Sequence, residues 1–233
     1  MIKLRDVSLR LGSGDPGTVV QFDLPAFEVT AGESVALTGP SGCGKSTLLN
    51  LVSGLRRADR GELCVARNDL TKLSPAQLDR HRGAHCGMIF QTFHLLAPFT
   101  AIENVAIGLR FGGRKRFRAK GRATEVLCRV GLEHRLHARP DELSVGERQR
   151  VAIARAIAGG ASILLADEPT GALDPETGRA VFNLLREIAS EEGRTMLMVT
   201  HDPVLASELP RTFDCSGLVS SAPANLEEEV AVV

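Results

Sequence analysis

The length, composition and charge of the chain already exclude several classes of protein. Its 233 residues can bury one substantial hydrophobic core but are few for two full domains. Its 28 basic residues balance its 28 acidic residues, so no strong field of either sign indicates a nucleic-acid partner. No apolar run approaches the roughly 18 residues of a membrane-spanning helix. Because the first residues also lack the features of a signal peptide, we expect a cytoplasmic protein.

The first part of the chain predicts strands followed by a helix. Residues 2–10 and 18–30 alternate apolar and polar positions, as half-buried antiparallel strands do. The short apolar run at 34–38 has the form of a buried parallel strand. A helix is expected from Lys45 to about Leu55, where Gly54 and charged residues end it.

The remainder of the chain alternates helices and strands. Asp174 and Pro175 have the residue types of an N-cap and a first helical position, between strands expected at 162–166 and 195–199. This alternation indicates an α/β fold with a mostly parallel sheet. We expect one domain over 1–220, made of a core (about 1–91 and 160–220) and a helical insertion (about 92–159), followed by a disordered tail (221–233).

One segment matches the phosphate-binding pattern G-x-x-x-x-G-K-[ST] in full, after a predicted strand and before a predicted helix. Glycines at these spacings let backbone N–H groups converge on phosphate oxygens, and the helix N-terminus adds partial positive charge. Lys45 would reach the β- and γ-phosphates, Ser46 would ligate Mg²⁺, and Thr47 would lie in range of the α-phosphate. The predicted nucleotide-binding residues of this loop are Gly39, Pro40, Ser41, Gly42, Cys43, Gly44, Lys45, Ser46 and Thr47.

Two acids and a histidine follow predicted strands. Asp167 and Glu168 come directly after the apolar run 163–166, and His201 comes shortly after the strand at 195–199. Because a buried carboxylate is costly unless it meets a cation, Asp167 is expected to hold the water shell of Mg²⁺. Glu168 is expected to polarise the attacking water as general base. His201 is expected to contact the γ-phosphate, since ligands in open α/β sheets bind at the carboxyl ends of the strands.

Further motifs carry a resemblance to one family. The run Leu143-Ser144-Val145-Gly146-Glu147 is similar to the signature sequence of ABC ATPases, usually Leu-Ser-Gly-Gly-Gln/Glu. Gln91, the segment 171–174 and His201 match the family's Q-loop, D-loop and switch histidine, in the family's order and across almost the whole chain. Within the family, residues 90–105 resemble the corresponding segment of lipoprotein-releasing and macrolide-exporter type ATPases, the LolD/MacB/FtsE group.

The resemblance implies a P-loop (RecA-like) α/β core with an antiparallel β subdomain and an inserted helical subdomain. It implies hydrolysis of ATP with Mg²⁺ by a head-to-tail dimer with a second copy or a paralogue. Each ATP would lie between the P-loop of one subunit and the signature of the other. The dimer would drive an integral membrane permease from the cytoplasmic side of the inner membrane, as a peripheral protein, without nucleic acid.

The resemblance also assigns roles to individual residues. Besides the phosphate-binding loop, they are Glu168, His201 and Gln91 for catalysis, Ser46, Gln91 and Asp167 for the metal, and Leu11, Ser144, Val145, Gly146, Glu147 and Asp174 for the nucleotide.

Two departures from the family pattern bear on activity. Val145 stands where the family has its first signature glycine, whose backbone tolerates dihedrals that a β-branched residue resists. Its added bulk predicts a weaker closed dimer and slower turnover. The chain also has no tyrosine or tryptophan to stack on adenine near Leu11, with Phe22 a nearby candidate to replace it. Losing a stacking contact worth about 0.5–1.5 kcal/mol predicts modest ATP affinity and weak discrimination against GTP.

Other interpretations of the sequence stay open. One alternative is the ATPase of a solute importer, and another, which Val145 leaves open, is a catalytically weak regulatory subunit with a stronger partner. An ABC protein acting on ribosomes or DNA is disfavoured, since the single cassette carries no long coiled coil or zinc motif. The basic run 114–122 predicts either a solvated helix face or a contact with anionic lipid headgroups.

Overall fold

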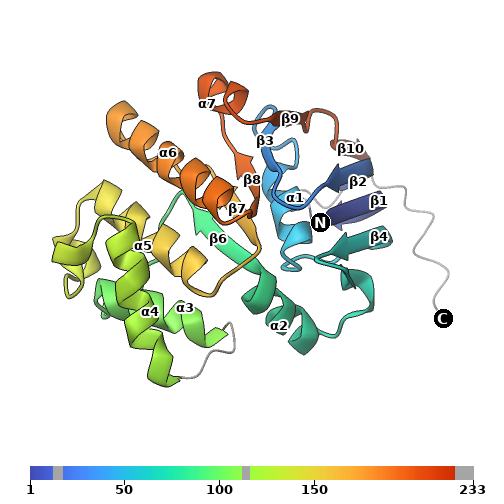
Figure 1. Ribbon diagram of the computed structural model, residues 1–233. Coiled ribbons are helices and arrows are strands. Elements are labelled where there is room, and N and C mark those ends of the chain that lie inside the picture. Colours follow the sequence, from blue (N-terminus) through green and yellow to red (C-terminus); the bar gives the residue numbers. More distant parts are fainter. Residues whose placement is uncertain (13–17, 112–115, 224–233) are drawn as a thin grey trace.

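Two five-stranded sheets form the framework of the molecule (Figure 1). The computed structural model describes residues 1–12, 18–111 and 116–223. One sheet contains β1 (Ile2–Leu11), β2 (Thr18–Val29), β4 (Arg60–Val65), β5 (Asn68–Asp69) and β10 (Val219–Pro223). The other contains β3 (Ser34–Thr38), β6 (Cys86–Phe90), β7 (Ile163–Asp167), β8 (Thr195–Val199) and β9 (Arg211–Asp214). The first is antiparallel in the order β10-β2-β1-β4-β5, and the second is parallel in the order β6-β7-β8-β3-β9.

Helices cover the parallel sheet on both faces (Figure 1). They are α1 (Lys45–Val52), α2 (Pro75–His85), α3 (Ala101–Phe111), α4 (Arg116–Arg129), α5 (Val145–Ala158), α6 (Pro175–Glu191) and α7 (Pro203–Ser207), with short 3-10 turns at Leu70–Lys72, Glu133–Arg135 and Pro140–Glu142. The group α3 to α5 lies together at one side of the molecule. Among the described helices, none combines the length and the apolar composition that crossing a bilayer requires.

Two hydrophobic cores meet at the parallel sheet, because successive side chains of a strand point to opposite faces. In β7, Leu164 and Ala166 join the core that includes residues of α3 to α6. Ile163 and Leu165 join the core between the two sheets, which contains α1. The strand is therefore buried on both faces, as its continuous apolar sequence predicts.

The predicted α/β class with a parallel and an antiparallel sheet is confirmed, but two boundaries differ. The helix α1 ends at Val52 rather than near Leu55, because Gly54 adopts φ 69° just beyond its last turn. The disordered tail predicted from 221 is wrong for 221–223, because this stretch belongs to β10, which pairs antiparallel with the start of β2. Residues 224–233, and part of the basic run 114–122, lie outside the described residues.

Gly61 lies where the pairing of β1 with β4 shifts register. The shift falls between Arg5 and Ser8, and Asp6 there has φ 49°. Gly61 itself has φ 97°, and a Cβ at this position would lie 2.4 Å from the Asp6 carbonyl oxygen and 2.6 Å from that of Arg5. These neighbours are backbone atoms, so they cannot rotate away as a side chain could.

We expect Gly61→Ala to lower the free energy of unfolding by about 1–3 kcal/mol, the usual cost of one strained backbone position. Urea unfolding would measure it. The control is Gly121→Ala in α4, where nothing lies within 4 Å of the added Cβ. It should stabilise the protein by about 0.5–1 kcal/mol, since alanine favours a helix over glycine. A Gly61→Ala protein as stable as the wild type would contradict the clash.

Candidate functional site

The phosphate-binding motif forms a loop that leaves β3 and enters α1. Its glycines Gly39, Gly42 and Gly44 have φ of 128°, 78° and 108°, conformations that side chains disfavour. A Cβ on Gly39 would also lie 2.8 Å from Sγ of the buried Cys43. Ser41 and Ser46 are exposed, so the loop and the N-terminus of α1 present polar groups to solvent. Such a loop can receive an anion from several backbone N–H groups.

Lys45 is held inside this loop. Its side chain is 6% exposed, and Nζ donates hydrogen bonds to the carbonyl oxygens of Gly39 and Pro40, both at 2.8 Å. The loop therefore fixes the position of the ammonium group, which can act as a point charge toward a phosphate.

The ring of Phe22 packs against Gly44 of the phosphate-binding loop. It is completely buried, and a Cβ on Gly44 would lie 2.8 Å from its Cε2 atom. The expectation that Phe22 could stack on adenine is therefore wrong, because its ring belongs to the core between the sheets. Leu11 ends β1 and is only partly buried, next to residues 13–17 outside the described range. Its contact with a base stays a prediction.

Asp167 ends β7 beside the phosphate-binding loop. It accepts a hydrogen bond from the Ser46 hydroxyl, and Lys45 lies close enough to stabilise its charge. Burial, with a smaller contribution from the adjacent Glu168, nevertheless raises the pKa of Asp167 above its ordinary value. A bound cation can stabilise the charge of a partly buried carboxylate of this kind.

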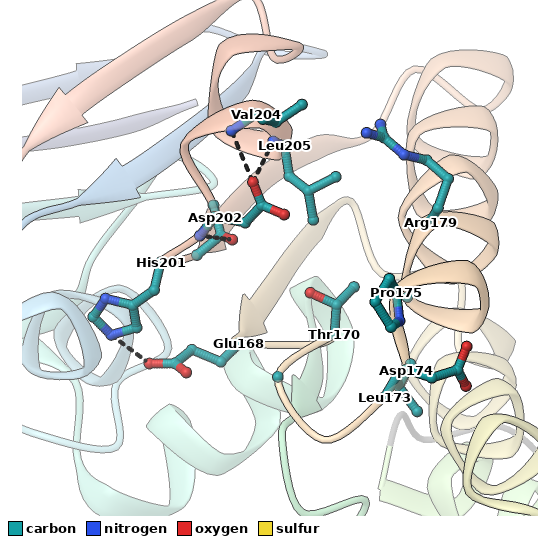
Figure 2. Close-up of a pocket in the computed structure, with 13 residues that line it drawn as sticks. Glu168, Thr170, Leu173, Asp174, Pro175, Arg179, His201, Asp202, Val204 and Leu205 are labelled. Atoms are coloured by element: carbon teal, nitrogen blue, oxygen red, sulfur yellow. Dashed lines mark hydrogen bonds and ion pairs between the residues drawn. The ribbon is translucent and has the colours of Figure 1, made fainter.

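Glu168 and His201 meet at the ends of neighbouring strands (Figure 2). Nε2 of His201 lies 2.9 Å from Oε1 of Glu168. Glu168 has φ 47°, and its N–H donates to the Val199 carbonyl at 3.1 Å, so β8 holds the unusual backbone turn in place. Strained non-glycine residues of this kind concentrate at functional sites.

Gln91 joins the same group from the end of β6. A Cβ built on Gly171 would lie 2.9 Å from Nε2 of Gln91 and 3.4 Å from Oε2 of Glu168, so the three residues adjoin. The structure thus brings Gln91, Glu168 and His201 to one edge of the parallel sheet. Asp167 and Lys45 lie at the same edge.

Asp174 caps α6, as its sequence context predicts. Its Oδ1 accepts a hydrogen bond from the Thr177 N–H at 3.0 Å, which holds the pKa of the carboxyl below its ordinary value. Asp174 lines a cavity of about 510 Å³ together with Glu168 and His201 (Figure 2). In the described part of the chain, no group of three His, Cys, Asp or Glu side chains could hold a metal by itself.

The signature residues lie at the start of α5. Ser144 is the N-cap of α5 and forms a capping box with Glu147, whose carboxylate also accepts a hydrogen bond from Nε of Arg135 at 3.1 Å. A Cβ on Gly146 would lie 2.6 Å from Cγ2 of Thr177, so this glycine is needed for close packing on α6. The signature thus packs against the first turn of α6, the helix that Asp174 caps.

Val145 occupies the first position of α5 and is 40% exposed. Its backbone is therefore helical, a conformation open to every residue. The expectation that this position demands glycine-like dihedrals is wrong, because a helix begins there. Only the size of the exposed side chain distinguishes valine from glycine here.

Two residues outside the motifs also touch this region. Gln149 and Arg155 extend from α5 and donate hydrogen bonds to backbone carbonyls next to the candidate catalytic residues. One signal in the sequence was available: helical spacing places the polar Gln149 on the same face as Ile153 and Ala156, which are buried.

Comparison with known proteins agrees with the motifs. The model of the ABC transporter family matches residues 23–171. The lipoprotein-releasing system ATP-binding protein LolD of Chromohalobacter salexigens is 45% identical over 198 residues, 85% of this chain and 84% of that protein. The LolD protein of Shewanella oneidensis is 44% identical, over 91% of both chains. The macrolide export ATP-binding/permease protein MacB of Pectobacterium atrosepticum is 41% identical over 92% of this chain but only 33% of its own length.

Solved structures give the same result. The dimeric post-hydrolysis state of the ATP-binding cassette MJ0796, bound to ADP and Pi, is 36% identical with a TM-score of 0.82, covering 92% of this chain and 94% of that one. A second dimeric structure of MJ0796, described as a bacterial ABC transporter cassette, is 34% identical with a TM-score of 0.82 and covers 97% and 99%. With most of its length matched at this identity, the chain belongs to the ABC transporter family.

Proposed function

We propose that this chain is the ATP-hydrolysing subunit of a transporter of the LolD/MacB type, working as a dimer on a separate membrane subunit. The observation that carries the proposal is the group of Gln91, Glu168 and His201 at the sheet edge that also bears Lys45 and the Ser46–Asp167 pair. One edge thus combines a phosphate-binding loop, a carboxylate suited to a cation and a carboxylate suited to activating water.

The loop and Asp167 would hold MgATP. Lys45 would turn from its two backbone carbonyls to the β- and γ-phosphates, and the loop N–H groups would bind the remaining phosphate oxygens. Mg²⁺ is usually held by a few protein oxygens together with substrate phosphates, and Ser46, Asp167 and Gln91 offer such oxygens. Bound there, it would offset the negative charge of the phosphates. The raised pKa of Asp167 supports this fit, because a bound cation would offset the cost of burying the charged carboxylate.

Glu168 would act as the general base. Its carboxylate would take a proton from water as the water oxygen bonds to the γ-phosphorus, and the bond to the bridging oxygen would break to release ADP. His201, 2.9 Å from Oε1 of Glu168, would orient that carboxylate and contact the γ-phosphate. Gln91 would complete the ring of polar groups around the water.

The signature surface would act on the nucleotide of a second copy or paralogue. Ser144, Val145, Gly146 and Glu147 lie at the helical start of α5. A head-to-tail dimer would bring the N-terminus of α5 to the partner's phosphates. ATP would then favour the closed dimer and hydrolysis would release it, so that nucleotide shifts the population between the two states. The dimeric state of MJ0796 supports this arrangement.

The relatives support a membrane partner. MacB is named as an ATP-binding and permease protein in one chain, and the present chain matches a third of its length. LolD, named as the ATP-binding protein of a releasing system, is matched over most of its length. The permease portion would therefore be a separate subunit, with this chain bound peripherally at the cytoplasmic face of the inner membrane.

Glu168→Gln should reduce MgATP hydrolysis to near background, because the amide cannot accept the proton from water. It should also accumulate an ATP-bound dimer. Phosphate release and size-exclusion chromatography with and without MgATP would measure both effects. Glu176→Gln, an exposed acid in the first turn of α6, is the control and should retain wild-type turnover. A wild-type protein that hydrolyses no ATP would contradict the proposal.

The same Glu168→Gln protein, held with MgATP, can capture the partner from detergent-solubilised membranes for mass spectrometry. A permease with few spans and a large external domain supports the LolD/MacB type. A multi-span permease with a solute-binding protein would favour the importer, and only ribosomal or DNA-bound partners would contradict a transporter.

Asp167→Asn should stabilise the nucleotide-free protein at neutral pH while lowering Mg²⁺-dependent activity by about 10- to 100-fold. Because the folded-state pKa of Asp167 is raised, the folded protein binds this proton more tightly than the unfolded chain. The ionised carboxylate therefore costs stability at pH 7, and this cost disappears as pH falls through the raised pKa. Urea unfolding of both proteins from pH 7 to pH 4 tests this, and a gain that grows toward low pH would contradict it.

Val145→Ala and Val145→Gly should both strengthen ATP-induced dimerisation and raise turnover. Excess bulk at a packed contact costs about 1–3 kcal/mol, so the dimerisation constant should rise about fivefold or more. Alanine should recover most of the effect, because the helical backbone at this position does not require glycine. Leu55→Ala, which truncates a side chain that is 50% exposed, is the control. If neither Val145 variant changes dimerisation or turnover, valine does not limit closure.

A further inference from the structure

A buried glutamine extends from α5 toward the catalytic edge of the sheet. Gln149 is 0% exposed and lies in the second turn of the helix that begins at the signature. Its Nε2 donates a hydrogen bond to the Pro169 carbonyl at 2.7 Å and a longer one to the Phe90 carbonyl at 3.4 Å. Pro169 directly follows Glu168, and Phe90 directly precedes Gln91. One side-chain amide therefore ties together the two chain segments that carry the proposed base and the adjoining glutamine.

A second side chain of α5 holds the other side of Gln91. Arg155 donates hydrogen bonds to the carbonyls of Phe93 at 2.7 Å and His94 at 2.5 Å. Arg155 is partly buried, and this burial lowers the pKa of its guanidinium. The backbone on both sides of Gln91 is thus bonded to one helix.

The amide of Gln149 is incompletely satisfied. Among the described residues, its buried Oε1 has no hydrogen-bond partner. Burying such an acceptor is costly, and a methionine or leucine of similar volume would fill the space without that cost. The feature that distinguishes glutamine here is therefore its N–H donor, which fixes the Pro169 and Phe90 carbonyls.

We propose that Gln149 is a positioning residue for ATP hydrolysis, which aligns Glu168 and Gln91 through the backbone next to each. The inference rests on the proposed ATPase function. Because Ser144, Val145 and Gly146 begin the same helix, contact of the signature with the partner's nucleotide is passed through Gln149 to the catalytic pair of its own subunit. The two nucleotide sites of a dimer are then mechanically linked within each chain.

The test is Gln149→Met, which keeps the side-chain volume and removes the donor. We expect kcat for MgATP to fall about tenfold to a hundredfold, the usual effect of a small misplacement of catalytic groups. Affinity for a fluorescent ATP analogue should stay unchanged, because the two hydrogen bonds that Gln149 donates end on Phe90 and Pro169, outside the phosphate-binding loop. A purely structural role would instead lower the melting temperature and weaken nucleotide binding together with kcat.

Arg150→Met is the matched control. Arg150 neighbours Gln149 on α5 and also donates to a backbone carbonyl, that of Val130 at 3.0 Å, away from the catalytic edge. It should keep the wild-type kcat. If Gln149→Met does not fold, Gln149→Asn retains an amide too short to bridge the two carbonyls and should show the same loss of kcat.

The outcomes separate the two proposals. An active wild type with an unchanged kcat in Gln149→Met, or with kcat and nucleotide affinity falling in parallel, would overturn the positioning role alone. A wild type without ATPase activity would refute the proposed function, and this inference with it.

Discussion

The register of the parallel strands is the constraint on which the site depends. Phe90 pairs with Asp167, Asp167 pairs with Val199, and Val199 pairs with Leu37. The residues that follow, Gln91, Glu168 and Thr200, therefore leave the sheet at one level, beside the start of the phosphate-binding loop. A slip of one residue in any of these pairs would turn alternate side chains into the wrong core. The two buried faces of β7 thus protect the alignment of the catalytic edge.

Close packing around this edge explains several of its residues. Gly44 lies on the ring of Phe22, and Gly146 lies on Thr177, so in both places a glycine allows a helix to start against its neighbour. Gly87 in β6 has a similar role, since a Cβ there would lie 2.6 Å from the Ala156 carbonyl. The helix α5 can therefore approach β6 closely enough for the Gln149 side chain to reach the strand end. The close approach of α5 to β6 thus also allows the hydrogen bonds of Gln149.

The sequence predicted the parts of the structure that chemistry or burial imposes on residue type. The strands β3, β7 and β8 are continuous apolar runs, and the residues after them carry phosphate-binding and acid–base chemistry, so both were recognisable. By contrast, β6 contains Gly87 and directly follows α2 without an intervening turn signal, so the sequence does not mark it as a separate strand. In β10, Val219 packs against the core between the sheets, but the two serines and the small residues after it resemble a tail in sequence.

Side-chain surroundings were harder to predict than elements. The signature motif does not show that a helix begins at Val145. From the motif alone, valine therefore seems unsuited to a position where the family has glycine. Phe22 looked available as an aromatic ring, although alternation along β2 directs it into the core. Helical spacing places Gln149 on a buried face of α5, but the sequence does not show which distant carbonyls its amide would bond.

The internal hydrogen bonds of Lys45 have a thermodynamic consequence. The ammonium group is already withdrawn from water and held by two carbonyl oxygens of its own loop. When phosphates bind, Lys45 therefore exchanges these carbonyl acceptors for phosphate oxygens. The binding free energy is not reduced by the cost of desolvating a free lysine or of ordering a long flexible side chain. Nucleotide binding therefore replaces hydrogen bonds that already exist within the loop, and it requires little further ordering of the Lys45 side chain.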